Sequence, residues 1–221
     1  MRKIFIAVFL LLNVTVFAQP QLKGGLEAYI LSNLIYPAYS LQNCIDGQVK
    51  IAFKLNQAGE VTYSTIQAGV GTDLDDEALR LIRSSTGKWI IPSGYDTTSL
   101  AVVPVNFKLD AVNCRNKTKA SVRQAIDTYQ AQQGLEDAIL NYYRNKENGK
   151  ADAAEEERYI ALKKEGGYDE AYMKHRIEMG QKKLKQNDKQ GACEDFQFVK
   201  YMGYNLADEL LKQHCATNFT Q

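Results

Sequence analysis

The side chains with the clearest capacity for chemistry are four closely spaced carboxylates, Asp73, Asp75, Asp76 and Glu77. Clustered carboxylate oxygens are the ligands that hard cations prefer, so a cation site is one interpretation. The other is a helix start, where Asp73 accepts hydrogen bonds from free backbone N–H groups and its neighbours favour the positive end of the helix dipole. Because no EF-hand spacing or turn glycine accompanies the cluster, we favour capping and predict no metal site.

The cysteines are the next reactive groups: Cys44, Cys114, Cys193 and Cys215. There is no Cys-x-x-Cys motif, so two disulfides are favoured over catalytic thiols. Cys193 and Cys215 lie symmetrically about a helix break at Gly203-Tyr204, and facing positions of a helical hairpin suit a disulfide. Cys44 with Cys114 follows mostly by elimination. The strand directions expected below do not obviously bring that second pair together.

Histidine chemistry has little support in the sequence. His175 and His214 each lie in a charged helical segment without a His-x-x-x-His pairing, so a solvated helix surface is the favoured interpretation. The sequence also lacks a Gly-x-Ser-x-Gly elbow, a Walker loop and a dinucleotide fingerprint. We therefore predict no catalytic residue, no cofactor and no enzymatic activity.

Trp89 and Tyr95 flank a turn at Pro92-Ser93-Gly94. An exposed aromatic anchor for a partner is one interpretation. We favour the other, in which Trp89 closes the open edge of a small core.

Residues 1–18 have the features of a secretory signal peptide. Arg2-Lys3 precede an apolar run from Ile4 to Leu12, and cleavage is expected after Ala18. Asn13 interrupts the run, whereas an uncleaved anchor needs about 20 apolar residues. We expect a cleaved leader and an exported protein.

Charge is nearly balanced, with 27 Lys and Arg against 26 Asp and Glu. No basic field exists to attract nucleic acid or an anionic membrane, and we predict no nucleic-acid partner. With 45% hydrophobic residues in 221, the chain is long enough for one or two cores.

A strand from Gln48 to Leu55 shows the most regular pattern. Its apolar positions are Val49, Ile51, Phe53 and Leu55, and its polar-face positions are Gln48, Lys50, Ala52 and Lys54. A turn at Gln57-Ala58-Gly59 leads to a second strand, Glu60 to Gln67. A helix from Leu74 to Arg83 then forms an apolar stripe of Leu74, Ala78, Leu81 and Ile82. A half-exposed sheet with helices on one side is an α+β fold.

From Thr118 onward the composition is typical of helices, with expected breaks at Gly134, Gly149, Gly166-Gly167 and Gly203. We expect about six helices here. One segment resembles a single degenerate tetratricopeptide repeat through Gly180, Ala192, Phe196 and Val199, with a turn at Asn187-Asp188. Since one repeat cannot form a groove, we favour a simple helical hairpin over a peptide-binding repeat.

The order of elements from Gly24 to Leu109 resembles the C-terminal domain of TonB, the periplasmic protein that contacts outer-membrane transporters. It comprises a short apolar helix after Gly24-Gly25, the strand pair, the acid-rich helix, Trp89 and a last strand from Val102 to Leu109. The resemblance implies a small antiparallel sheet with two helices on one face over residues 24–110. An all-α helical-hairpin domain over residues 118–216 would follow.

Pro104 confines the last strand to a sheet edge or a bulge, because proline lacks a backbone N–H. In the TonB family a short receptor segment adds to the sheet, which implies an edge from Ala101 to Leu109 here. The implied partner-binding positions are Val102, Val103, Val105, Asn106 and Phe107. A proline at Val105 is then predicted to abolish peptide capture without unfolding. Alternatively, Pro104 only protects the edge from aggregation, or the helical region covers it.

Three functions follow from the resemblance. The first is a periplasmic module that binds an extended peptide of an outer-membrane TonB-dependent transporter or another envelope protein by strand addition. The second is a TonB-type energy transducer anchored in the inner membrane by residues 1–18. It is less favoured because Gln19 to Lys23, the only residues between the expected cleavage site and the domain, reach about 17 Å at most, which is far short of the width of the periplasm. The membrane histidine through which the family contacts its motor complex is also missing from residues 1–18. The third is a structural homodimer or scaffold.

Overall fold

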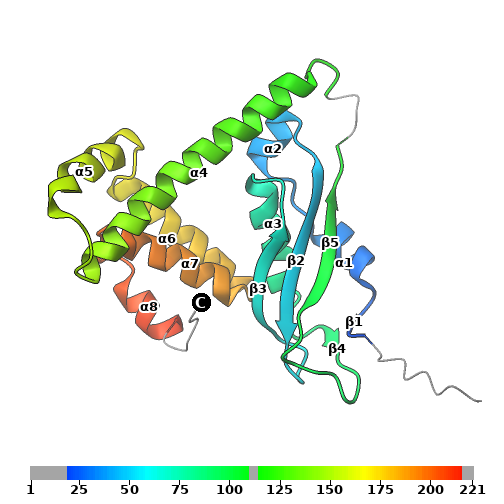
Figure 1. The fold of residues 1–221 in the computed structure, drawn as a ribbon. Helices are drawn as coiled ribbons and strands as arrows, with labels where there is room; N and C mark the ends of the chain where they lie inside the picture. Colours follow the sequence, from blue (N-terminus) through cyan, green and yellow to red (C-terminus); the bar gives the residue numbers. More distant parts are fainter. Residues whose placement is uncertain (1–18, 110–113, 216–221) are drawn as a thin grey trace, which may run out of the picture.

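The structure is a computed structural model that describes residues 19–109 and 114–215. The predicted signal peptide, residues 1–18, lies outside the described residues. The first part of the chain forms β1 (Gln21–Leu22), α1 (Leu26–Asn33), α2 (Ala38–Asn43), β2 (Gly47–Leu55), β3 (Val61–Ala68), α3 (Asp73–Arg83), β4 (Trp89–Ile90) and β5 (Ala101–Phe107) (Figure 1). The second part forms α4 (Lys119–Glu147), a 3₁₀ turn (Ala153–Glu155), α5 (Glu156–Glu165), α6 (Glu170–Lys185), α7 (Lys189–Tyr201) and α8 (Asp208–His214). The predicted α+β class is confirmed.

The main sheet has the strand order β3-β2-β5, and both pairings are antiparallel. In the central strand β2 every predicted apolar position is fully buried, namely Val49, Ile51, Phe53 and Leu55. Gln48 and Lys50 on the opposite face are exposed, as expected, whereas Ala52 is buried. Alternation along β2 therefore sets which face of the sheet receives the helices.

Helix α3 covers that apolar face. Its predicted stripe of Leu74, Ala78, Leu81 and Ile82 is fully buried. Leu26, Tyr29 and Ile30 of α1 pack against the same core, and the Tyr29 hydroxyl lies 3.1 Å from Ser84 Oγ at the end of α3.

Trp89 belongs to this core rather than to a surface. Its side chain is 6% exposed, its ring centroid lies 5.0 Å from that of Phe53, and its Nε1–H donates to Ser85 Oγ at 2.7 Å. Strand β4, which contains Trp89, pairs with β1 in a separate two-stranded sheet. The preferred interpretation of this tryptophan as a core residue is confirmed.

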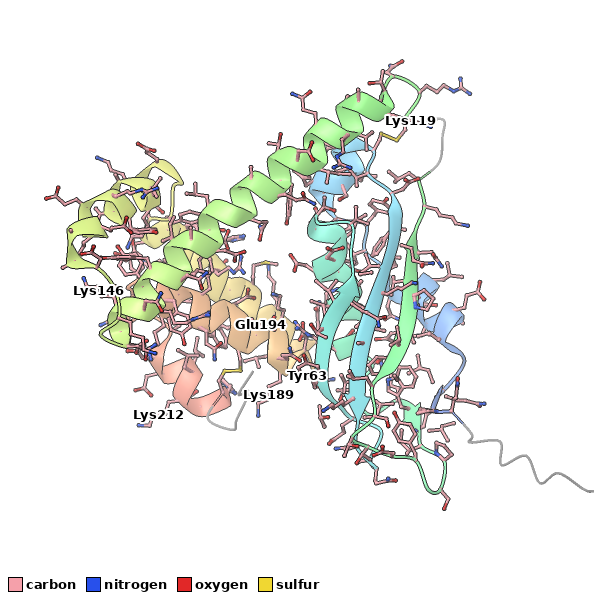
Figure 2. All side chains as sticks on the ribbon, in the orientation of Figure 1. Tyr63, Lys119, Lys146, Lys189, Glu194 and Lys212 are labelled. Carbon is pink, nitrogen blue, oxygen red and sulfur yellow. A yellow bond between two sulfur atoms is a disulfide. The ribbon has the colours of Figure 1, made fainter. Side chains whose placement is uncertain are left out.

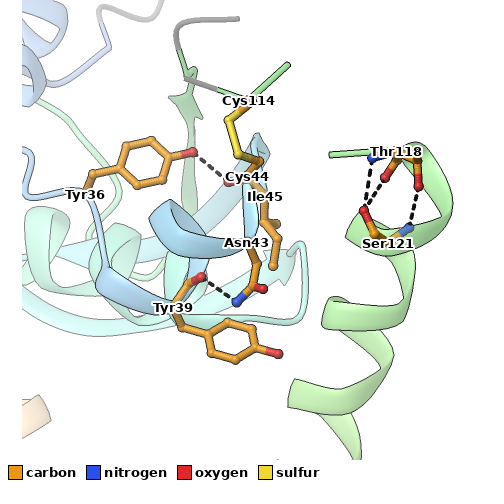
Figure 3. Close-up of a disulfide and its surroundings, with 8 residues drawn as sticks. All are labelled: Tyr36, Tyr39, Asn43, Cys44, Ile45, Cys114, Thr118 and Ser121. Atoms are coloured by element: carbon orange, nitrogen blue, oxygen red, sulfur yellow. Dashed lines mark hydrogen bonds between the residues drawn. A yellow bond between two sulfur atoms is a disulfide. The ribbon is translucent and has the colours of Figure 1, made fainter. Parts of the chain in front are cut away.

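Helix α4 corrects the expected break at Gly134. The helix runs for 29 residues through that glycine, and a Cβ added there would meet no atom within 4 Å. A helical glycine costs about 1 kcal/mol relative to alanine, which the surrounding helix formers outweigh. The start is reinforced by a capping box between Thr118 and Ser121 (Figure 3).

The predicted turn at Asn187-Asp188 joins α6 to α7 in a helical hairpin, which we call the α6–α7 hairpin. Gly180 is required for its packing, because an added Cβ would lie 2.5 Å from the ring of Phe196. Ala192 and Val199 are also fully buried. The likeness to a tetratricopeptide repeat stays a prediction.

Both predicted cysteine pairings are present. Cys193 bridges α7 to Cys215, which caps α8, with a Cα–Cα distance of 5.7 Å. Cys44 bridges Cys114 with a Cα–Cα distance of 5.8 Å (Figure 3). The strand directions do bring this second pair together: β5 pairs antiparallel with β2, and Gly47 opposite Phe107 places the two cysteines at one end of the sheet.

Helix α4 contacts both parts of the molecule (Figure 1). Near its start, the Ala125 carbonyl accepts a hydrogen bond from Tyr39 Oη at 2.7 Å, and the Tyr129 and Tyr39 rings lie 5.0 Å apart. Further along, α4 packs against α5 and α7. In the described ranges no helix is both long and apolar enough to cross a membrane.

A candidate partner-binding edge

Strand β5 lies at one edge of the three-stranded sheet, where Pro104 pairs with Lys50 of β2. The expectation that Pro104 marks an edge strand is confirmed. Among the described residues, no strand or side chain makes a hydrogen bond to the outer backbone groups of β5. We call this outer row of backbone groups the β5 edge.

The five predicted positions fall into two sets. Val102, which is 45% exposed, and Asn106 point away from the core, and Asn106 Oδ1 accepts a hydrogen bond from Gln48 at 2.8 Å. Val105 and Phe107 are buried in the core, and Val103 is half-buried. A partner at this edge would therefore find the side chains of the first set accessible, whereas those of the second set are wholly or partly used by the core.

Backbone direction along the sheet follows from one printed contact and from alternation. In an antiparallel strand the N–H and C=O of one residue point to the same side, and successive residues alternate. Ser64 of β3 directs its N–H and C=O outward, toward Gln190. Thr65 therefore faces Ala52 of β2, and Ala52 turns its groups away from β5.

The same alternation then gives the direction of each β5 residue. Val102, opposite Ala52, points its N–H and C=O outward, as do Pro104 and Asn106. Because Pro104 lies at an outward-facing position, its missing N–H removes no hydrogen bond between β2 and β5. Within residues 19–109 and 114–215, the N–H groups of Val102 and Asn106 are the free donors of the β5 edge, with a gap between them at Pro104.

This geometry makes Val105→Pro an unsuitable test of peptide capture. Val105 is fully buried and pairs with Val49, so its N–H points toward β2. A proline there would remove a bond from the sheet itself, and we expect it to unfold the domain.

The acidic cluster at the start of α3 organises neighbouring segments, and its capping role differs from the prediction. Thr72, not Asp73, is the N-cap of α3. Asp73 instead accepts backbone N–H bonds from Tyr39 at 3.0 Å and Ser40 at 3.4 Å, so it caps α2. The sequence pattern did not predict α2, because its cap is supplied from a distant segment.

Two further carboxylates of the cluster, Asp75 and Glu77, accept hydrogen bonds from backbone N–H groups. Asp75 accepts N–H bonds from Val70 and Gly71 at 2.8 and 2.9 Å. Burial raises the pKa of Asp75, and these two bonds oppose the rise. Glu77 accepts the Ile35 N–H at 2.8 Å and forms an ion pair with Arg80. The cluster therefore holds in place the loop between α1 and α2, the start of α2 and the loop that leads into α3.

The remaining sequence candidates lie away from the β5 edge. His175 on α6 has a side chain that is 67% exposed. No group of three or more His, Cys, Asp and Glu in residues 19–109 and 114–215 is arranged to hold a metal ion.

Residues 32–109, from the end of α1 to just beyond β5, match the family model described as the Gram-negative bacterial TonB protein C-terminal. No curated protein and no solved structure matches the chain. Domains of this family serve protein interactions in the cell envelope. The three-stranded sheet, α3 and the β5 edge thus all lie within the segment that is similar to the TonB C-terminal family.

Proposed function

We propose that this protein captures an extended peptide of an envelope protein by strand addition to the β5 edge. The partner we favour is the periplasmic segment of an outer-membrane TonB-dependent transporter. The supporting observation is that β5 is an edge strand inside the segment that is similar to the TonB C-terminal family, and that its outward backbone groups have no partner among the described residues. Main-chain hydrogen bonds supply affinity in this mode of recognition, and alternate side chains supply specificity.

The arrangement of donors on β5 determines how such a peptide pairs. Val102 and Asn106 each offer an N–H and a C=O, whereas Pro104 offers only a C=O. The peptide therefore pairs on both sides of the proline and leaves one of its own carbonyls without a partner there. The exposed Val102 side chain favours an apolar residue on the same face of the peptide.

The test removes single donors without touching the core. Val102→Pro and Asn106→Pro each delete one outward N–H, while Val102→Ala and Asn106→Ala delete the same side chain and keep the N–H. The probes are synthetic peptides that cover the periplasmic N-terminal segments of the organism's outer-membrane transporters, and calorimetry measures binding. Each proline should weaken binding about fivefold or more relative to its alanine control.

Equal binding by proline and alanine variants would exclude the β5 edge. Circular dichroism of each variant shows whether the sheet is intact. A peptide set without any binder would redirect the search to other envelope proteins, with the wild-type protein as bait and Val102→Pro/Asn106→Pro as the matched control.

The proposal includes export, with the leader cleaved after Ala18. The intact mass of protein purified from its native envelope tests this directly. The expected species begins at Gln19 and gains four hydrogens on reduction, because both disulfides open. A membrane-retained species that still carries residues 1–18 would favour the energy-transducer alternative.

A further inference from the structure

The opposite edge of the sheet, the outer backbone row of β3, is occupied by a side chain from the helical region. Gln190 of α7 makes two backbone contacts with Ser64: its Oε1 accepts the Ser64 N–H at 3.2 Å, and its Nε2 donates to the Ser64 carbonyl at 3.1 Å. A neighbouring strand would make this same pair of bonds. Gln190 therefore substitutes for one residue of a fourth strand at what we call the β3 edge.

A closed network of polar contacts holds Gln190 in this position. Arg83 of α3, only 6% exposed, donates to Ser64 Oγ at 2.8 Å and to both carboxylate oxygens of Glu194 at 2.8 Å. Glu194 in turn accepts a bond from Gln190 Nε2 at 3.1 Å. Figure 2 shows Glu194 and Lys189 on α7 beside Tyr63 on β3. The contact is thus fixed in geometry from β3, α3 and α7 together.

The start of α7 is itself firmly positioned. Asp188, 1% exposed, accepts the Gly191 N–H at 2.7 Å and lies 3.9 Å from Arg83 Nε. The other end of the β3 edge is also occupied, since the Val61 N–H donates to Thr86 Oγ1 at 2.9 Å. The fold therefore supplies side-chain partners at two places along β3.

The composition of β3 explains why such closure matters. Edge strands are commonly protected from pairing with other chains by charged residues or by proline. The eight residues of β3, Val61–Ala68, include no charge and no proline. They are rich in β-branched side chains, and Tyr63 and Ile66 are 39% and 38% exposed. An uncharged, β-branched strand without proline is the type that pairs with copies of itself.

We infer that β3 is a second strand-pairing edge of this protein, and that the α6–α7 hairpin keeps it closed to β3 of a second copy. Two identical strands pair antiparallel about a two-fold axis, so the same surface serves both chains. With Gln190 in place, the Ser64 N–H and C=O are already used and the helix occupies the space of the incoming strand. This inference does not depend on peptide capture by β5.

The test opens the β3 edge and follows the Ser64 amide. Gln190→Ala/Glu194→Ala removes the mimicking amide and the carboxylate that holds it, while Lys189→Ala on the adjacent exposed position is the matched control. In dilute solution, hydrogen exchange at Ser64 should be roughly tenfold faster in the double variant than in the wild type or the control. At high concentration, sedimentation velocity should show a dimer of the double variant only, and Ser64 exchange should slow again.

Three results would overturn the inference. Unchanged Ser64 exchange in the double variant would mean that Gln190 does not close this edge. Fast Ser64 exchange without association at any concentration would exclude a second copy as the partner. Association in which Ser64 stays unprotected would assign the dimer to another surface.

Two controls keep the test decisive. The α6–α7 hairpin must retain its helical circular dichroism, and the Cys193–Cys215 disulfide must be intact by mass. Asn106→Pro in the double-variant background removes a donor of the β5 edge without affecting β3. Dimerisation that persists in this background separates the β3 edge from the peptide-binding edge proposed above.

Discussion

The two edges of the three-stranded sheet differ in whether side chains of the same chain bind their outward backbone groups. Both β3 and β5 are uncharged and pair antiparallel with the same central strand. Along β3, Gln190 and Thr86 bind outward backbone groups, whereas the outward groups of β5 have no such partner among the described residues. β5 carries its own partial protection in Pro104. The difference shows that the availability of an edge depends on what the rest of the chain packs against it.

The largest expected effect comes from the disulfide at the end of β5. In Cys44→Ser/Cys114→Ser the loss of a bridge that closes a 70-residue separation should lower the free energy of unfolding by about 4 kcal/mol. Urea denaturation measures this loss. Hydrogen exchange should rise first near Phe107 at the β2–β5 end, and less at Ser64. Equal fraying of both edges would contradict the view that the bridge secures β5 specifically.

Arg83→Ala should have the next largest effect. It removes the nearer of the two cations that stabilise the buried Asp188 carboxylate, and it removes the donor to Ser64 Oγ, so we expect a loss of about 3 kcal/mol in unfolding free energy. Arg83→Lys keeps the charge without the two-pronged geometry and should fall between wild type and alanine. Urea denaturation with exchange at Ser64 checks both variants. A loss in stability without faster Ser64 exchange would separate this arginine from closure of the β3 edge.

Gly180→Ala tests the packing between the two helices of the α6–α7 hairpin, which carries Gln190. The added methyl would lie 2.5 Å from the Phe196 ring, and overpacking of this kind costs about 1–3 kcal/mol, less the gain in helix propensity. Thermal unfolding measures the change. Gly134→Ala on α4 is the matched control, since open space surrounds that position, and it should be slightly stabilising. Destabilisation by both substitutions would argue against the packing explanation.

Thr86→Val is expected to have the smallest effect. It removes the acceptor of the Val61 N–H while keeping the side-chain shape, so the loss should be about 1 kcal/mol. Exchange at the Val61 amide should rise while exchange at Ser64 stays unchanged, which would show that the β3 edge is closed at two independent places. A coupled rise at Ser64 would show a single cooperative closure instead.

Local patterns predicted much of the fold. Strict alternation from Val49 to Leu55 predicted the central strand and its buried face, and the spacing of Leu74, Ala78, Leu81 and Ile82 predicted the helix that covers it. These features succeed because the period of an element and the burial of its apolar side are set by residues close in sequence. Pro104 restricted its strand to a sheet edge or a bulge for the same reason, since its missing N–H is a property of one residue.

Other features required contacts between distant segments. Helix α2 depends on a cap from Asp73. Cys44 lies close enough to Cys114 for a disulfide because β5 pairs with β2. In the same way the β3 edge is closed by Gln190, at a separation of 126 residues from Ser64. The sequence by itself determined β2 and α3, their buried faces and the restriction of Pro104 to a sheet edge or a bulge. Only the tertiary structure decided which edge is open, because a glutamine can replace a strand only where packing of the hairpin on α3 brings its amide to the backbone.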